Sequence, residues 1–147
     1  PDRQPVLLEA WAAVIDGLGP ARRLVIGGKS MGGRMATMAA AAAEQAGEPV
    51  AGVVCLGYPF HPPGRPEKTR VEHLKDLATP TLIVQGTRDR LGARADVDGY
   101  DLSSAIRLLW LEDGDHDLTP RKKSGRTQAQ NWGEAVAGIS GFLETLD

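Results

Sequence analysis

The chain of 147 residues has 41% hydrophobic and 24% charged residues, enough for one compact domain with an apolar core, and we treat residues 1–147 as a single domain. Its 17 basic and 19 acidic residues give a net charge of −2, which argues against nucleic acid or an anionic membrane as a partner. The single cysteine, Cys55, excludes an internal disulfide and every multi-cysteine zinc pattern. No apolar run reaches the roughly 18 residues needed to span a bilayer. These features predict a soluble cytoplasmic protein.

The first part of the chain predicts a helix, a buried strand and a second helix. Apolar residues recur at three- and four-residue steps over residues 6–18, the period of an amphipathic helix, and Gly19-Pro20 ends it. Residues 24–26 form a short apolar run before two glycines, as in a strand buried within a parallel sheet. Residues 31–44 are rich in alanine and methionine, which favour a helix that packs closely on the sheet.

The same alternation continues to the end of the chain. Further strands are predicted over residues 51–57, 80–86 and 106–111, with a short helix over residues 69–77. Strands that alternate with helices predict an α/β fold, a three-layer α/β/α arrangement around a mostly parallel sheet. The last predicted helix, residues 128–146, has an apolar face that includes Trp132, Val136, Ile139, Phe142 and Leu143.

A G-x-S-x-G motif, Gly28-Lys29-Ser30-Met31-Gly32, lies between the first strand and the helix that follows it. In this context the glycines permit a sharp turn, which leaves the Ser30 hydroxyl projecting from the sheet edge in a strained backbone position. The positive end of the helix dipole points at the same place. The amide of Met31 would donate a hydrogen bond to an oxyanion. The motif therefore predicts Ser30 as a nucleophile.

Two nucleotide-binding interpretations of these glycines fail on spacing. A Walker A loop needs a glycine five residues before Gly28, where this chain has Arg23. A dinucleotide fingerprint needs G-x-G-x-x-G, and Gly27, Gly28, Gly32 and Gly33 do not have that spacing. A glycine-rich turn that only packs the strand against the helix remains the alternative for this segment taken alone.

Two polar residues follow later strands at the same edge of the predicted sheet. Asp89 comes after the strand at 81–85 and His116 after the strand at 106–111. Both therefore lie on the rim that carries Ser30, where α/β proteins place their sites. A serine hydroxyl needs a base, and the base needs an acid that orients it. Because Ser, Asp, His is also the chain order used by hydrolases with such a sheet, we predict Asp89 as the acid and His116 as the base.

Each of these assignments has a competitor. Asp89 could simply cap a turn beside its arginine neighbours. His61, in the proline-rich loop of residues 59–66, could line a pocket but precedes the acid, and His73 is predicted to be solvated on the helix at 69–77. Asp115 and Asp117 flank His116 in a tight loop, where they are less able to reach its Nδ1 than an acid from an adjacent strand.

Further residues carry weaker predictions. Tyr58, His61 and Lys29 are candidate substrate-binding residues. Cys55 is expected to be a small buried hydrophobe in its strand. A metal ion or organic cofactor is not implied. Two groups of basic residues are predicted to be mainly solvated surface, although the first could bind an acidic substrate: Lys68, Arg70 and Arg88, and the loop cluster Arg121-Lys122-Lys123.

Four segments together resemble the small bacterial predicted α/β-hydrolases, which are related to dienelactone-hydrolase-like proteins and to the hydrolase-like domain of chromatin-complex and testis-expressed homologues. The resemblance runs over nearly the whole chain and is carried by residues 27–34 (GGKSMGGR), 57–64 (GYPFHPPG), 85–89 (QGTRD) and 114–116 (GDH). It implies Ser30 as nucleophile, Asp89 as acid and His116 as base. Some eukaryotic relatives act as scaffolds.

The front of the chain departs from this family's pattern. Its members begin with further strands and a His-Gly loop that supplies a second oxyanion donor, and nothing here matches them, so the chain resembles the C-terminal part of the fold. Without those strands, Leu24 to Ile26 would form an exposed apolar edge, which invites pairing with another chain. We expect a fragment of a longer protein or a homo-oligomer joined through this edge. The predicted function is serine hydrolysis of an ester or related small acyl substrate, and the alternative is an inactive binding or scaffold domain.

Overall fold

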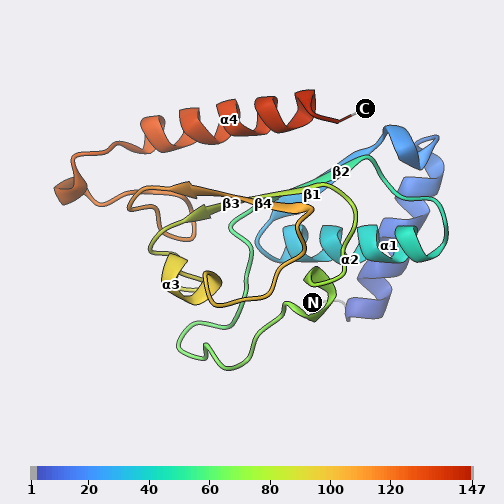
Figure 1. Ribbon diagram of the computed structural model, residues 1–147, viewed down its shortest axis with the longest axis horizontal. Coiled ribbons are helices and arrows are strands. Elements are labelled where there is room, and N and C mark those ends of the chain that lie inside the picture. The colour runs from blue at the N-terminus through green and yellow to red at the C-terminus, as the bar shows by residue number, and fades with distance from the viewer. Residues whose placement is uncertain (1–2, 147) are drawn as a thin grey trace.

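The computed structural model describes residues 3–146, and its sheet contains four parallel strands in the order β1-β2-β3-β4 (Figure 1). The strands are β1 (Val25–Lys29), β2 (Gly52–Leu56), β3 (Thr81–Gly86) and β4 (Ile106–Leu111). Val25 lies opposite Gly52, and Thr81 lies opposite Ile106. The carboxyl ends of all four strands therefore lie along one rim. The helices are α1 (Gln4–Gly17), α2 (Met31–Gln45), α3 (Arg94–Val97) and α4 (Gln128–Glu144), with 3-10 turns at Ala21–Arg23, Glu72–Leu74 and Lys122–Ser124.

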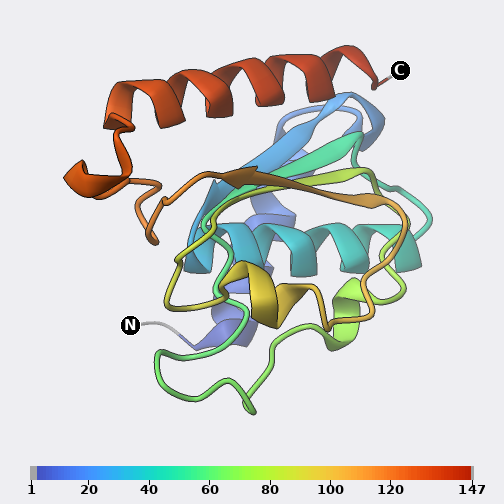
Figure 2. The same cartoon turned by 60° about the vertical axis from the view of Figure 1, so that its left-hand side comes forward.

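Helices cover both faces of the sheet, so the predicted three-layer α/β/α arrangement is confirmed. α4 runs across one face, and α2 covers the other with α1 beside it (Figures 1 and 2). On the α2 side, Ala36 and Ala40 pack in the same cluster as Val53, Cys55 and Ile83. Alanine is small enough to let the helix approach the sheet closely, and burying a side chain such as Ile83 is worth about 1.5–3 kcal/mol. The cluster on the α4 side contains Leu82, Val84, Leu111, Ala135 and Phe142.

The apolar face predicted for the last helix is only partly buried. Phe142 is 3% exposed, but Trp132 is 53% and Val136 67% exposed. On the edge strand β1, Val25 is also 41% exposed. The spacing of the apolar residues predicted this helix correctly, since α4 spans Gln128–Glu144. It could not show how much of the apolar face a four-stranded sheet would leave uncovered.

The prediction of a helix over residues 69–77 is wrong, since the structure has only the 3-10 turn Glu72–Leu74 there. Leu74 and Leu77 are both buried and stand three residues apart, a spacing that also fits a helix. His73 is not solvated as predicted, because its Nε2 lies 2.8 Å from Thr37 Oγ. The short helix α3, Arg94–Val97, lies between β3 and β4, where the sequence predicted no helix. Among the described residues, none of the helices has the length and apolar character needed to cross a membrane.

Candidate active site

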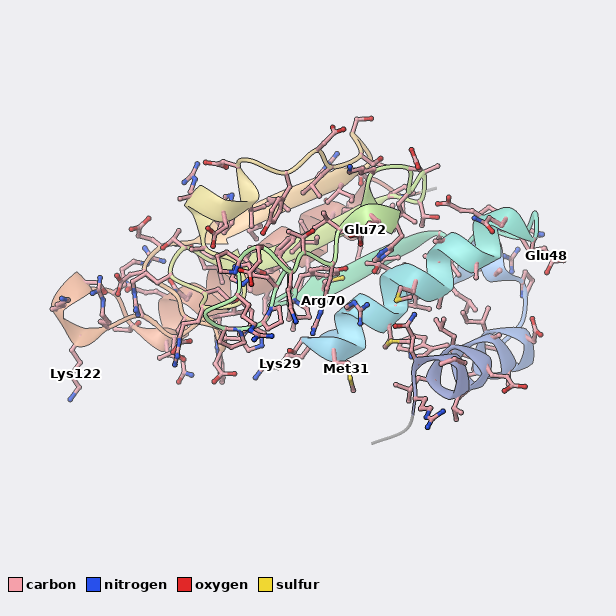
Figure 3. The ribbon with its side chains drawn as sticks, turned by 90° about the horizontal axis from the view of Figure 1, so that it is seen from below. Lys29, Met31, Glu48, Arg70, Glu72 and Lys122 are labelled. Atoms are coloured by element: carbon pink, nitrogen blue, oxygen red, sulfur yellow. The ribbon has the colours of Figure 1, made fainter. Side chains whose placement is uncertain are left out.

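Ser30 lies at the junction of β1 and α2, where the backbone reverses direction. Its φ of 51° and ψ of −121° fall in a region that L residues rarely adopt. The Ser30 amide donates a hydrogen bond to the Leu56 carbonyl at 2.9 Å, which extends the β1–β2 ladder by one residue. Figure 3 labels Lys29 and Met31, the chain neighbours of Ser30 at the start of α2. The strained position predicted for Ser30 is therefore present.

Glycines allow this turn because the strand and the helix approach each other without intervening side chains. A Cβ added to Gly28 would lie 2.6 Å from the carbonyl carbon of Gly32, and one added to Gly33 would lie 2.8 Å from the Gly28 oxygen. Both distances are too short for any side chain. A Cβ on Gly32 would meet no atom within 4 Å. Close packing in this structure thus requires Gly28 and Gly33, and does not account for Gly32.

Three side chains from three different loops are joined in a row by hydrogen bonds. Nε2 of His116 lies 2.9 Å from Oγ of Ser30. Nδ1 of the same ring lies 2.9 Å from Oδ2 of Asp89. The parallel sheet brings these residues together across 86 positions of sequence, because each follows the carboxyl end of a strand. The Oδ1 atom of Asp115 instead accepts the backbone amides of Asp117 and Thr119.

The Asp89 carboxylate is 1% exposed and accepts two further hydrogen bonds. Its Oδ1 accepts the Leu91 amide at 2.8 Å, and its Oδ2 accepts Nε2 of Gln85 at 3.1 Å. Gln85 also exchanges hydrogen bonds with the backbone of Tyr58 and donates to the Gly92 carbonyl. Sequence reasoning missed Gln85. The available signal was a glutamine in the otherwise apolar strand β3, where a buried amide needs partners.

Ion pairs and hydrogen bonds hold the loop that carries His116 on both sides. Arg121 forms a two-pronged ion pair with Asp113, and Arg88 also contacts this carboxylate. Asn131 of α4 donates to the Leu118 carbonyl at 2.9 Å. Arg121 is therefore not the merely solvated residue that the sequence suggested. These contacts fix the loop, because Asp113 accepts both the backbone amide and the guanidinium of Arg121.

The pKa of His116 lies above its ordinary value. The main cause is the hydrogen bond from its ring to the Asp89 carboxylate, which favours the imidazolium. Partial burial of the ring acts in the opposite direction. The nearby charge of Asp117 adds to the rise in pKa, and that of Lys29 reduces it. Lys29 and Asp117 form an ion pair with each other, and both side chains are largely exposed.

The structure does not support substrate contacts for two of the predicted binding residues. Tyr58 is fully buried and its hydroxyl donates to the Arg70 carbonyl at 2.9 Å. His61 is 3% exposed, with Nδ1 2.8 Å from the Pro62 carbonyl oxygen and Nε2 3.1 Å from the Asp96 carboxylate. Both side chains support the loop after β2. The position of each in the chain could not reveal that its polar atoms have partners inside the protein.

A parallel sheet that places a serine on a sharp strand-to-helix turn, with an acid and a histidine beyond later strands, defines the class of α/β hydrolases. Residues 1–144 match the family described as alpha/beta hydrolase domain. The chain belongs to this family.

Solved structures agree with the fold. The chain is similar to a predicted CIB-like hydrolase from Thermoplasma acidophilum, with 26% identity and a TM-score of 0.57 over 78% of this chain and 51% of that one. It is similar to a putative non-heme bromoperoxidase from Mycobacterium tuberculosis, with 13% identity and a TM-score of 0.68 over 96% and 75%. It also resembles a monoacylglycerol lipase from Paleococcus ferrophilus, with 11% identity and a TM-score of 0.61 over 78% and 67%. The chain thus spans about half the length of the Thermoplasma protein.

Proposed function

We propose that this protein is a serine hydrolase that acts on an ester or a related acyl substrate. The observation that carries the proposal is the row of two 2.9 Å hydrogen bonds from Ser30 through His116 to the buried Asp89 carboxylate. A serine hydroxyl is a weak nucleophile unless a base takes its proton. Here the base lies within hydrogen-bonding distance, and an acid holds its ring in place. Neutral His116, with its proton on Nδ1, accepts the Ser30 proton at Nε2.

The reaction follows from these positions. As Nε2 of His116 removes the hydroxyl proton, Oγ of Ser30 forms a bond to the acyl carbon and the carbonyl electron pair moves to oxygen. Asp89 stabilises the imidazolium. When the carbonyl reforms, the bond to the alcohol breaks and the leaving oxygen takes the proton from His116. A water molecule then repeats the sequence on the acyl-enzyme, which releases the acid and restores Ser30.

The start of α2 provides electrostatic help for the tetrahedral oxyanion. The first amides of a helix have no partner within the helix and carry the positive end of its dipole. We assign the amide of Met31 as one oxyanion donor, because Met31 is the first residue of α2 and directly follows the nucleophile. One such donor contributes about 10²–10³-fold to kcat in other serine hydrolases.

Labelling with a fluorophosphonate probe, read by intact mass, tests the proposal. We expect one label per chain in the wild type, and none in Ser30→Ala or in His116→Ala. Ser140→Ala is the matched control, because Ser140 is exposed on α4 and should leave labelling unchanged. Circular dichroism establishes that each variant is folded. A folded wild-type protein that takes up no label would argue against an activated Ser30.

Two observations favour a second candidate, a binding or scaffold domain without activity. β1 is an edge strand, and a cavity of about 270 Å³ next to His116 is lined mainly by apolar side chains of α4 and its surroundings. Such a surface suits a polypeptide partner. The kinship with dienelactone-hydrolase-like and chromatin-complex proteins, and a cytoplasmic location, stay predictions.

A further inference from the structure

Two arginines near the nucleophile have no counter-ion among residues 3–146. Arg34 lies in the first turns of α2, where its amide donates to the Ser30 carbonyl at 3.1 Å. Nε of Arg34 is buried and makes no hydrogen bond. Arg70, in the loop after β2, makes no side-chain hydrogen bond or ion pair to the described part of the chain, and both residues are only partly exposed. A buried guanidinium nitrogen without an acceptor, such as Nε of Arg34, is costly, which suggests that a ligand completes it.

Both arginines act electrostatically on the hydroxyl of the buried Tyr58. That hydroxyl bonds to the Arg70 carbonyl at 2.9 Å. Burial raises the pKa of the Tyr58 phenol, and Thr37, Arg34 and Arg70 act in the opposite direction, which places both positive charges within Coulombic reach of the phenol. Glu72 lies in the same segment as Arg70 and acts, like Arg34, on the charge of His73, but it forms no ion pair with either arginine in residues 3–146.

This pair is close to Ser30 along the helix. Residues four apart lie on the same face of a helix, with Cβ atoms about 5–6 Å apart, and helical side chains tilt toward the N-terminus. The Arg34 side chain therefore extends toward the turn that begins at Ser30. Arg70 lies just before the 3-10 turn Glu72–Leu74, and this turn contacts α2 through His73 and Thr37. An acyl group bonded to Oγ of Ser30 could thus reach this charge with a short carbon chain.

We propose that Arg34 and Arg70 bind a carboxylate in the acyl part of the substrate, so that the preferred substrates are half-esters of short dicarboxylic acids. This inference rests on the proposed serine-hydrolase function. Planar guanidinium groups match the two oxygens of a carboxylate. The acyl part stays attached to Ser30 until water releases it, so contacts with this carboxylate assist both halves of the reaction. Arg34 and Arg70 are specificity residues that take no proton from the reacting atoms.

Two esters of the same acyl length test the proposal. Hydrolysis of monoethyl glutarate and of ethyl valerate is followed by acid release in a pH-stat. We expect the wild type to prefer the glutarate ester. Arg34→Gln and Arg70→Gln should each lower kcat/KM for that ester about tenfold or more, the effect of losing one charged hydrogen bond, and change the value for ethyl valerate less than about twofold. Arg65→Gln, an exposed arginine of the same loop, is the control.

Equal losses on both esters, or no preference for the glutarate ester in the wild type, would overturn the carboxylate site. Calorimetry with glutarate and the Ser30→Ala variant separates this failure from that of the proposed function. Binding that disappears when Arg34→Gln is added supports the carboxylate site even if no ester is hydrolysed and no probe labels Ser30. Normal probe labelling without glutarate binding would leave the hydrolase proposal standing and refute the carboxylate site.

Discussion

Gly57 offers a sharp test of how the site is assembled, because its missing side chain leaves room for the histidine. It follows β2 with a φ of +67°, and a Cβ added to it would lie 2.8 Å from the His116 carbonyl oxygen and 3.3 Å from the ring atoms Cε1 and Nδ1. Gly57→Ala therefore combines a backbone penalty of about 1–2 kcal/mol for the left-handed conformation with about 1–3 kcal/mol for overpacking. The backbone of His116 must move to relieve the closest contact, and its ring moves with it.

Gly64→Ala isolates the backbone penalty. Gly64 has a similar φ of +72°, and a Cβ added there meets no atom within 4 Å. Urea unfolding should give a loss of about 1–2 kcal/mol for Gly64→Ala and a loss at least about 1 kcal/mol larger for Gly57→Ala. Because a displacement of about 1 Å can cost about 10²-fold in rate, fluorophosphonate labelling should slow strongly only in Gly57→Ala. Equal stability losses and equal labelling rates in the two variants would refute this reasoning.

Three further predictions concern Gln85, the titration of His116 and the exposed edge of the sheet. Gln85→Met should destabilise the protein by about 1–3 kcal/mol in urea unfolding and slow labelling, because the Tyr58 backbone loses its buried partner; unchanged stability would contradict this. The labelling rate should rise with pH through a midpoint above 6.5, the ordinary pKa of histidine, since only neutral His116 accepts a proton, and Asp117→Asn should lower that midpoint. The stability from the His116–Asp89 contact is full below the unfolded pKa of histidine and is lost as pH rises through the higher folded value. Finally, we expect the exposed β1 edge to join a second copy, so light scattering should show a dimer that Val25→Lys dissociates, and a stable wild-type monomer would count against it.

The sequence predicted the parts of the molecule that depend on local patterns. Apolar runs ended by glycine located three of the four strands, and β4 was placed at its observed bounds, Ile106–Leu111. For β1 the predicted run stopped at Ile26, whereas Gly27 and Gly28 continue the strand opposite Val54 and Cys55. A glycine pair is a turn signal locally, and only pairing with β2 shows that it is extended. The geometry around Ser30 was accessible because the spacing of its glycines is itself the signal.

Other features depend on contacts between distant segments, which leave little trace in one sequence. Arg121 was grouped with two lysines as a solvated cluster, yet it binds Asp113 on the other side of the His116 loop. Tyr58 was a candidate for substrate binding. Its ring turns inward, and its backbone is bound by Gln85 of the neighbouring strand. Position along the chain fixes which rim a residue occupies, but the direction of its side chain is decided by its partners.

The order of strands explains why a glycine, and not a further polar residue, lies at the centre of the site. Ser30 follows β1 and Asp89 follows β3, so β2 separates them by two strand spacings, about 10 Å in all. A single imidazole with a hydrogen bond at each nitrogen can bridge such a gap only if it lies over the end of β2. The residue at that end is Gly57, and a Cβ built on it would point at the His116 ring and its carbonyl oxygen. Any side chain at position 57 would compete with the His116 ring for the space over the end of β2. The absence of a side chain at Gly57 therefore allows the histidine to lie there.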